Sequence, residues 1–169
     1  MDGSDGTNGD VSADREPAVV VRPLNYVADE PIVRRIGDRD LYIGNRLAAD
    51  PDHHDRSFEF EFEYVLSVGS DEYPLTTHHR PLEDGPDNEW TVFEAAVDTA
   101  RELFRWDGSL LVHCKAGISR SSTLLATTLA AEEDRTFADA LALVQRARPH
   151  AMPHPALHEQ AICYLAARR

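Results

Sequence analysis

The sequence contains almost no lysine: Lys115 is the single lysine among 17 basic residues, so arginine carries nearly all of the positive charge. The 30 aspartates and glutamates outnumber these basic residues and leave a formal net charge of −13. Proteins that hold the nucleic-acid backbone need clustered cations, which displace counterions from the phosphates. We therefore expect no nucleic-acid partner.

Cysteines and long apolar runs are also scarce. The two cysteines, Cys114 and Cys163, cannot form a disulfide framework, and the first ten residues lack the basic and apolar stretches of a secretory signal. No stretch approaches the roughly 18 apolar residues that a membrane span needs. These absences predict a cytoplasmic protein with no membrane span.

The length and hydrophobic content suit one domain. The chain has 169 residues, of which 42% are hydrophobic, enough to fill a single core. Residues 1–16 hold five acidic residues and no sizeable apolar cluster, so we expect a disordered acidic tail there and one folded domain over 17–169. Acidity with so little lysine resembles the composition of salt-adapted haloarchaeal proteins, although a high-GC genome would also favour arginine.

The first half of the chain is rich in strand patterns. Residues 18–43 predict one or two strands near a sheet edge, residues 50–56 a polar loop and residues 75–82 another short strand. Between them, residues 58–68 begin with three phenylalanines that alternate with three glutamates. This period of two predicts a half-buried strand whose glutamates face solvent.

The second half favours helices. Apolar residues at helical spacing predict an amphipathic helix over 90–106, and a short apolar strand follows at 109–114. After Gly117 the chain predicts a buried helix that ends at about residue 133. A third helix is predicted to begin with a cap at 136–139 and to run through residue 144 or beyond, and a fourth to cover 156–167. This alternation predicts an α/β domain with a largely parallel central sheet.

The densest cluster of reactive side chains is the segment His113-Cys114-Lys115-Ala116-Gly117-Ile118-Ser119-Arg120-Ser121, which joins the predicted strand to the buried helix. Successive backbone N–H groups of such a loop, together with the positive end of the helix dipole, form a nest for a phosphate dianion. We expect residues 115–120 to bind this group.

Each side chain of the loop has a chemical reason to be there. The positive field favours the thiolate of Cys114, which is the nucleophilic form of the side chain. Arg120 can hold two phosphate oxygens in its planar fork, and Gly117 permits a tight turn around the anion. His113 would hold the loop backbone and assist thiolate formation, while Ser121 would donate a hydrogen bond to the sulfur as it leaves.

The pattern His-Cys-x5-Arg-Ser resembles the loop of the cysteine-dependent phosphatases, and Ile118–Ser121 is most similar to their dual-specificity branch. The likeness extends over about residues 34–167 and includes segments 41–45, 64–68 and 149–160, although His154 stands where the family often has Asn. It implies a three-layer, protein tyrosine phosphatase-like fold with a mainly parallel central sheet flanked by helices.

The same likeness implies a function. The domain would hydrolyse phosphomonoesters on phosphotyrosine and on phosphoserine or phosphothreonine of protein substrates, through a cysteinyl-phosphate intermediate and without a cofactor or metal. The family's general acid is an aspartate about thirty residues before the cysteine, and Asp84 stands 30 residues before Cys114. Glu83 and Asp87 are alternatives, and all three acids could instead serve only solubility.

Several other interpretations remain open. The Cys-Lys-Ala-Gly segment is shared with lipid-phosphate phosphatases, whose loops often carry another basic residue at the position of Ile118. A non-catalytic phosphate-binding module is a third possibility.

The sequence leaves the roles of some other residues open. Lys115 would face solvent or add positive charge to the rim of the pocket. We expect Cys163 to be a small buried apolar residue, with a disulfide to Cys114 as the alternative. The histidines at 53/54, 78/79 and 150/154/158 suggest metal binding only weakly, because prolines interrupt the last set.

Overall fold

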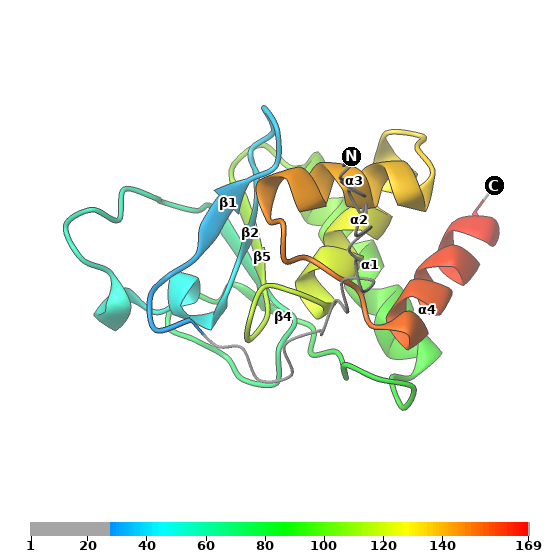
Figure 1. Ribbon diagram of the computed structural model, residues 1–169, viewed down its shortest axis with the longest axis horizontal. Coiled ribbons are helices and arrows are strands. Elements are labelled where there is room, and N and C mark those ends of the chain that lie inside the picture. The colour runs from blue at the N-terminus through cyan, green and yellow to red at the C-terminus, as the bar shows by residue number, and fades with distance from the viewer. Residues whose placement is uncertain (1–27, 169) are drawn as a thin grey trace, which may run out of the picture.

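The computed structural model of the protein describes residues 28–168 (Figure 1). The predicted acidic tail, residues 1–16, lies outside the described residues. The described range combines one mostly parallel sheet with helices that flank it, so the predicted α/β class is confirmed. None of its helices is long and apolar enough to cross a membrane.

Five strands form one sheet in the order β1-β2-β5-β3-β4. The edge strand β1 pairs antiparallel with β2, whereas β2, β5, β3 and β4 are parallel to one another. The mainly parallel sheet and the edge strand within residues 18–43 are therefore confirmed. The strands are β1 (Val33–Arg35), β2 (Leu41–Gly44), β3 (Tyr64–Ser67), β4 (His78–His79) and β5 (Leu110–His113).

Four α-helices lie together on one side of the sheet, as Figure 1 shows, and each was predicted from the sequence. The helix α2 is central, because it contacts the other three helices as well as β5 and β2. The helices are α1 (Trp90–Arg105), α2 (Arg120–Glu132), α3 (Phe137–Ala147) and α4 (Pro155–Ala166).

The helix α2 is buried along almost its whole length. Its leucines, Leu124, Leu125 and Leu129, are fully buried in the main core. The hydroxyls of Thr127 and Thr128 donate to the carbonyls of Thr123 and Leu124 one turn earlier, so these buried polar groups are satisfied within the helix. Because α2 begins at Arg120, this packing also fixes the end of the phosphate-binding loop.

A thinner layer covers the other face of the sheet. Two short 3-10 helices, η1 (Arg46–Ala49) and η2 (Pro51–His53), follow β2. Ala48 and Ala49 of η1 belong to a second apolar cluster with Val33, Val65 and Leu111 of the sheet. The sheet is thus flanked on both faces, in agreement with the three-layer prediction.

The predicted strand over residues 58–68 is wrong in its first half. Only β3, which begins at Tyr64, joins the sheet, and Tyr64 already pairs with Leu110, the first residue of the neighbouring β5. Earlier residues make no strand pairing: the backbone groups of Glu61 and Glu63 are hydrogen-bonded to the Ser109 hydroxyl, and the ring of Phe62 meets Tyr42 edge to face at 5.3 Å. Phe58 and Phe62 are half-buried and Phe60 is 41% exposed. The intervening glutamates are exposed, as predicted.

The prediction that Cys163 is buried is also wrong. Cys163 is an exposed free thiol on α4. The buried face of this helix is formed by Leu157, Ala161, Tyr164 and Leu165, which recur at helical spacing, and Cys163 lies off that stripe.

Candidate active site

The phosphate-binding loop connects the end of β5 to the first turn of α2, which is the predicted strand–loop–helix arrangement. Gly117 has a φ of +67°, in the left-handed region that favours glycine. A Cβ atom at Gly117 would lie 2.8 Å from the carbonyl oxygen of Gly44, at the end of β2. Gly117 therefore allows both the turn and the close approach of the loop to β2.

Cys114 follows the last residue of β5, and only 3% of it is exposed. Its Sγ lies 3.2 Å from the Oγ of Ser121, which is fully buried in the first turn of α2. This contact brings together the predicted nucleophile and the predicted hydrogen-bond donor to the sulfur. A hydroxyl at this distance stabilises a negative charge on the sulfur.

His113 is fully buried, and its Nε2 lies 2.5 Å from the Oγ of Ser67 on β3. Burial lowers the pKa of His113 to about 4, so the imidazole is neutral at neutral pH. The expected assistance to the thiolate therefore does not come from a positive charge on this ring. Ser67 in turn lies 2.7 Å from the Oγ1 of Thr76, so the ring is fixed by a chain of hydroxyls.

The side chain of Arg120 lines a cavity of about 240 Å³ together with Cys114. The cavity thus contains both the predicted nucleophile and the predicted oxyanion-binding side chain. Lys115 is exposed and lines the same cavity, which places it at the rim. The full set of lining residues is Arg46, Gly69, Ser70, Asp71, Tyr73, His113, Cys114, Lys115 and Arg120.

Arg148, which we did not single out from the sequence, holds the loop from behind. It is 5% exposed, and its guanidinium donates to the carbonyls of Gly117 and Ala116, each at 3.3 Å. The next carbonyl, that of Ile118, accepts from the backbone N–H of Met152 at 2.8 Å. Because the N–H of a trans peptide points away from its C=O, these contacts favour loop amides that face the anion site.

The acid-bearing loop touches the phosphate-binding loop through Asp84. Ser119, 4% exposed, donates from its Oγ to the Oδ1 of Asp84 at 2.5 Å. Glu83, Asp84 and Asp87 are all exposed and none of them lines the Cys114 cavity, but within residues 28–168 only the carboxylate of Asp84 is hydrogen-bonded to the phosphate-binding loop. Of the three predicted acids, Asp84 is the one that the structure brings to the loop.

The loop that carries Asp84 is fixed by a second residue that we did not predict, Asn88. Its side chain is buried and accepts from the backbone N–H of Glu83 at 2.9 Å. It also donates to Gln160 of α4 at 2.9 Å, and Gln160 donates back to the Asn88 carbonyl at 2.7 Å. These contacts tie the loop to α4.

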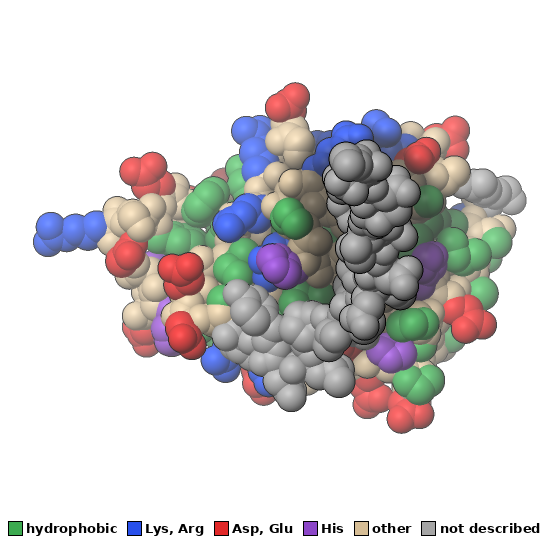
Figure 2. All heavy atoms as spheres, viewed as in Figure 1, with side chains coloured by type: hydrophobic (Ala, Val, Ile, Leu, Met, Phe, Trp, Pro, Cys, Tyr) green, Lys and Arg blue, Asp and Glu red, His purple; other side chains and the backbone are tan. Residues whose placement is uncertain are grey.

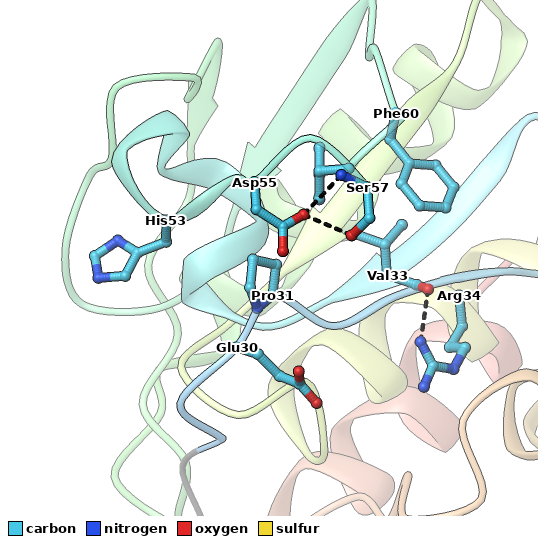
Figure 3. Close-up of a pocket in the computed structure, with 9 residues that line it drawn as sticks. Glu30, Pro31, Val33, Arg34, His53, Asp55, Ser57 and Phe60 are labelled. Carbon is cyan, nitrogen blue, oxygen red and sulfur yellow. Dashed lines mark hydrogen bonds between the residues drawn. The ribbon is translucent and has the colours of Figure 1, made fainter.

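A second cavity, of about 180 Å³, lies between the start of the described chain and the segment that precedes β3 (Figure 3). Its carboxylate Asp55 accepts from both the backbone N–H and the hydroxyl of Ser57, and these bonds lower the pKa of Asp55. Arg34 donates to the carbonyl of Val33. Neither cysteine lines this cavity, so it offers no equivalent of the Cys114 site.

The histidine sets do not converge. His154 caps α4, where its Nδ1 accepts from the N–H of Ala156, and His158 packs on Phe137 with 4.6 Å between ring centroids. Within residues 28–168, no three His, Cys, Asp or Glu side chains gather in a way that could hold a metal ion.

A buried cysteine on a strand–loop–helix turn, which shares a small cavity with an arginine, is typical of the cysteine-dependent phosphatases. Comparison with known proteins identifies the family: residues 41–165 match the model described as "Dual specificity phosphatase, catalytic domain". The chain belongs to this family.

Curated relatives agree with the family assignment. The chain is 35% identical over 107 residues to MAP kinase phosphatase with leucine-rich repeats protein 3 of Dictyostelium discoideum, a match over 60% of this chain and 12% of that protein. It is 45% identical over 58 residues to mouse dual specificity protein phosphatase 19, covering 34% of this chain and 26% of the relative. The chain thus spans less than two thirds of the length of these relatives.

Solved structures share the fold. Human DUSP28 superposes with a TM-score of 0.68 at 23% identity, over 82% of this chain and 98% of that one. A mouse putative dual specificity phosphatase complexed with zinc tungstate gives a TM-score of 0.67 at 24% identity, over 86% and 93% of the two chains. The predicted protein tyrosine phosphatase-like fold is confirmed.

Proposed function

We propose that the protein hydrolyses phosphomonoesters on phosphorylated proteins, on tyrosine and on serine or threonine, through a cysteinyl-phosphate intermediate. The observation that carries this proposal is the position of Cys114. Its sulfur is hydrogen-bonded to Ser121, and it shares one small cavity with Arg120. These groups supply a nucleophile and stabilise the charge on both the sulfur and the phosphoryl oxygens.

In the first step the Cys114 thiolate attacks phosphorus, and the bond from phosphorus to the ester oxygen breaks. Arg120 and the amides of residues 115–120 hold the phosphoryl oxygens as charge spreads over them. The protonated carboxyl of Asp84 gives its proton to the leaving oxygen, so the alcohol or phenol departs neutral. The products are the phosphocysteine, the dephosphorylated side chain and an ionised Asp84.

In the second step a water molecule attacks the phosphocysteine. Asp84, now ionised, takes a proton from the water, and the sulfur–phosphorus bond breaks. The Ser121 hydroxyl donates to the sulfur as negative charge returns to it, and inorganic phosphate leaves. The enzyme is then restored with Cys114 ionised and Asp84 protonated.

The substrate class is argued from the loop and from the charge of the surface. Ile118 is 6% exposed and does not line the cavity, so the position at which lipid phosphatases often carry an extra cation contributes none here. Acidic side chains are scattered over the described part of the face in Figure 2, and the chain has a net charge of −13. These features disfavour an anionic membrane surface or nucleic acid and support a protein substrate.

A substrate panel tests the proposal. Phosphotyrosine and phosphothreonine peptides, phosphatidylglycerophosphate and inositol phosphates would be compared by kcat/KM at several salt concentrations, with Cys114→Ser as the inactive control. We expect the phosphopeptides to be the best substrates. A preference for phosphatidylglycerophosphate or inositol phosphates would favour the lipid alternative, and phosphate binding without turnover would favour a non-catalytic module.

Three further expectations belong to the proposal. Acidity with a single lysine supports a salt-adapted protein of haloarchaeal type. Both cysteines are free thiols, which supports a cytoplasmic location. The matched residues 41–165 support a single phosphatase-like catalytic domain over 17–169.

A further inference from the structure

The side chains of Arg46 and Lys115 line the Cys114 cavity, and the proposed mechanism uses neither of them. Asp71 is the single carboxylate among the lining residues, against three Lys and Arg side chains. The lining of the cavity therefore carries a local excess of positive charge, although the net charge of the chain is −13. Arg120 is assigned to the scissile phosphate, which leaves two cations for another anion.

The backbone of Arg46 is hydrogen-bonded to the phosphate-binding loop. Its backbone N–H donates to the carbonyl of Lys115 at 3.2 Å. The preceding residue, Asn45, is fully buried, and its side chain accepts from the N–H of Ile32 at 3.0 Å and from that of Ala48 at 3.3 Å. The turn that carries Arg46 is thus fixed from both sides.

One nitrogen of the Arg46 guanidinium is left without a hydrogen-bond partner in residues 28–168. Its Nε is buried and has no hydrogen-bond partner within the described part of the chain. Two other arginines of this acidic chain have carboxylate partners: Arg39 donates to Glu133 and Arg101 to Glu132, both at 2.6 Å. A buried charged donor without a partner costs free energy, and an anion bound to the exposed part of the same guanidinium would offset some of that cost.

We propose that Arg46 and Lys115 form a second anion subsite beside Cys114, which binds a phosphate or carboxylate next to the scissile phosphate on the same phosphopeptide. This inference rests on the proposed function, because it assumes a peptide substrate. The planar fork of Arg46 binds two oxygens of the second group, and Lys115 adds a point charge from the rim. The subsite selects substrates with two neighbouring anions.

The test measures binding to the full chain carrying Cys114→Ser, by fluorescence anisotropy. The ligands are three phosphotyrosine peptides of equal length in which one residue next to the phosphotyrosine is alanine, glutamate or phosphothreonine. The set is made once with this residue before the phosphotyrosine and once with it after. We expect the doubly phosphorylated peptide to bind about tenfold more tightly than the alanine peptide, with the glutamate peptide between them.

Adding Arg46→Gln should reduce this preference to about twofold or less, and Arg46→Lys should restore part of it. Arg56→Gln is the matched control, because Arg56 is exposed, does not line the cavity and undergoes the same loss of charge. Thermal melting of each variant verifies that it is folded.

Two results would overturn the subsite: equal affinity of the parent for all three peptides, or an unchanged preference after Arg46→Gln. Failure of the proposed function is a separate result, seen when the protein with Cys114 intact does not hydrolyse the alanine peptide. Binding preference and turnover are measured independently, so each can fail without the other.

Discussion

Ser119 of the phosphate-binding loop donates a hydrogen bond of 2.5 Å to the carboxylate of Asp84, 35 residues earlier in the chain. The same Oγ accepts from the backbone N–H of His154 at 2.8 Å. One hydroxyl therefore links the loop that we expect to bind phosphate, the loop that carries the proposed acid and the start of α4. The proposed proton donor is thus positioned by the loop that we expect to hold the phosphoryl group.

Ser119→Ala should slow the proton transfer from Asp84. We expect kcat for alkyl phosphates, which need a proton donor, to fall about tenfold, and kcat for p-nitrophenyl phosphate to fall less. Asp84→Asn should lower kcat for the alkyl substrates by about 10² to 10⁴, and kcat for p-nitrophenyl phosphate much less, because p-nitrophenolate leaves without a proton. Ser57→Ala is the control, because Ser57 makes the same 2.5 Å contact with Asp55 away from the site. An unchanged kcat for the alkyl substrates in Asp84→Asn would move the role to Glu83 or Asp87.

Ser121→Ala should slow the second half-reaction. Removal of a hydrogen bond to a charged sulfur costs about 1.5–3 kcal/mol, which corresponds to a fall of roughly tenfold to a hundredfold in phosphocysteine hydrolysis. Rapid-quench kinetics should then show a burst of p-nitrophenol followed by slow turnover. Thr128→Val, which removes another buried hydroxyl of α2, should show no such burst. A uniform loss of both steps in Ser121→Ala would contradict the assigned role.

His113 should make the stability of the protein sensitive to mild acid. Burial lowers its pKa from 6.5 to about 4, so below about pH 6.5 the unfolded chain binds a proton that the folded chain does not. The free energy of unfolding should fall by about 2 kcal/mol between about pH 6.5 and pH 5 and continue to fall toward pH 4. Urea unfolding at each pH measures this, and His113→Gln should be markedly less sensitive. An equal loss in His113→Gln would assign the effect to other groups.

Salt should support activity. The net charge of −13 repels an anionic substrate at long range, whereas the loop amides and Arg120 capture phosphate at short range. At about 1 M salt the screening length is only about 3 Å, so the repulsion is removed and the local contacts remain. We expect kcat/KM for p-nitrophenyl phosphate to persist or rise from about 0.1 M to 1 M KCl. A maximum at low ionic strength would count against salt adaptation.

The strand–loop–helix arrangement was predictable because the residues of the loop are contiguous. Cys114, Gly117 and Arg120 fall within seven residues, and the strand before and helix after them have strong apolar patterns. The roles of Arg148 and Asn88 were not predictable in this way. Each acts on backbone groups that only the folded chain brings together, and the one local signal was the Arg-Pro pair at 148–149.

Residues 58–62 and Cys163 show two limits of periodicity. Alternating phenylalanines predict a strand, but a strand also needs a neighbouring backbone, and β5 begins too late to supply one. For Cys163 the residue type favoured burial, while the helical phase of α4 determined exposure. In both cases the long-range partner decided the outcome.

Covalent trapping tests the central claim most directly. Asp84→Asn, mixed with p-nitrophenyl phosphate and quenched in acid, should carry one phosphoryl group when its intact mass is measured, and peptide mapping should place that group on Cys114. Asp84→Asn combined with Cys114→Ser should carry none. A phosphoryl group on another residue, or turnover that persists in Cys114→Ser, would contradict the proposed mechanism.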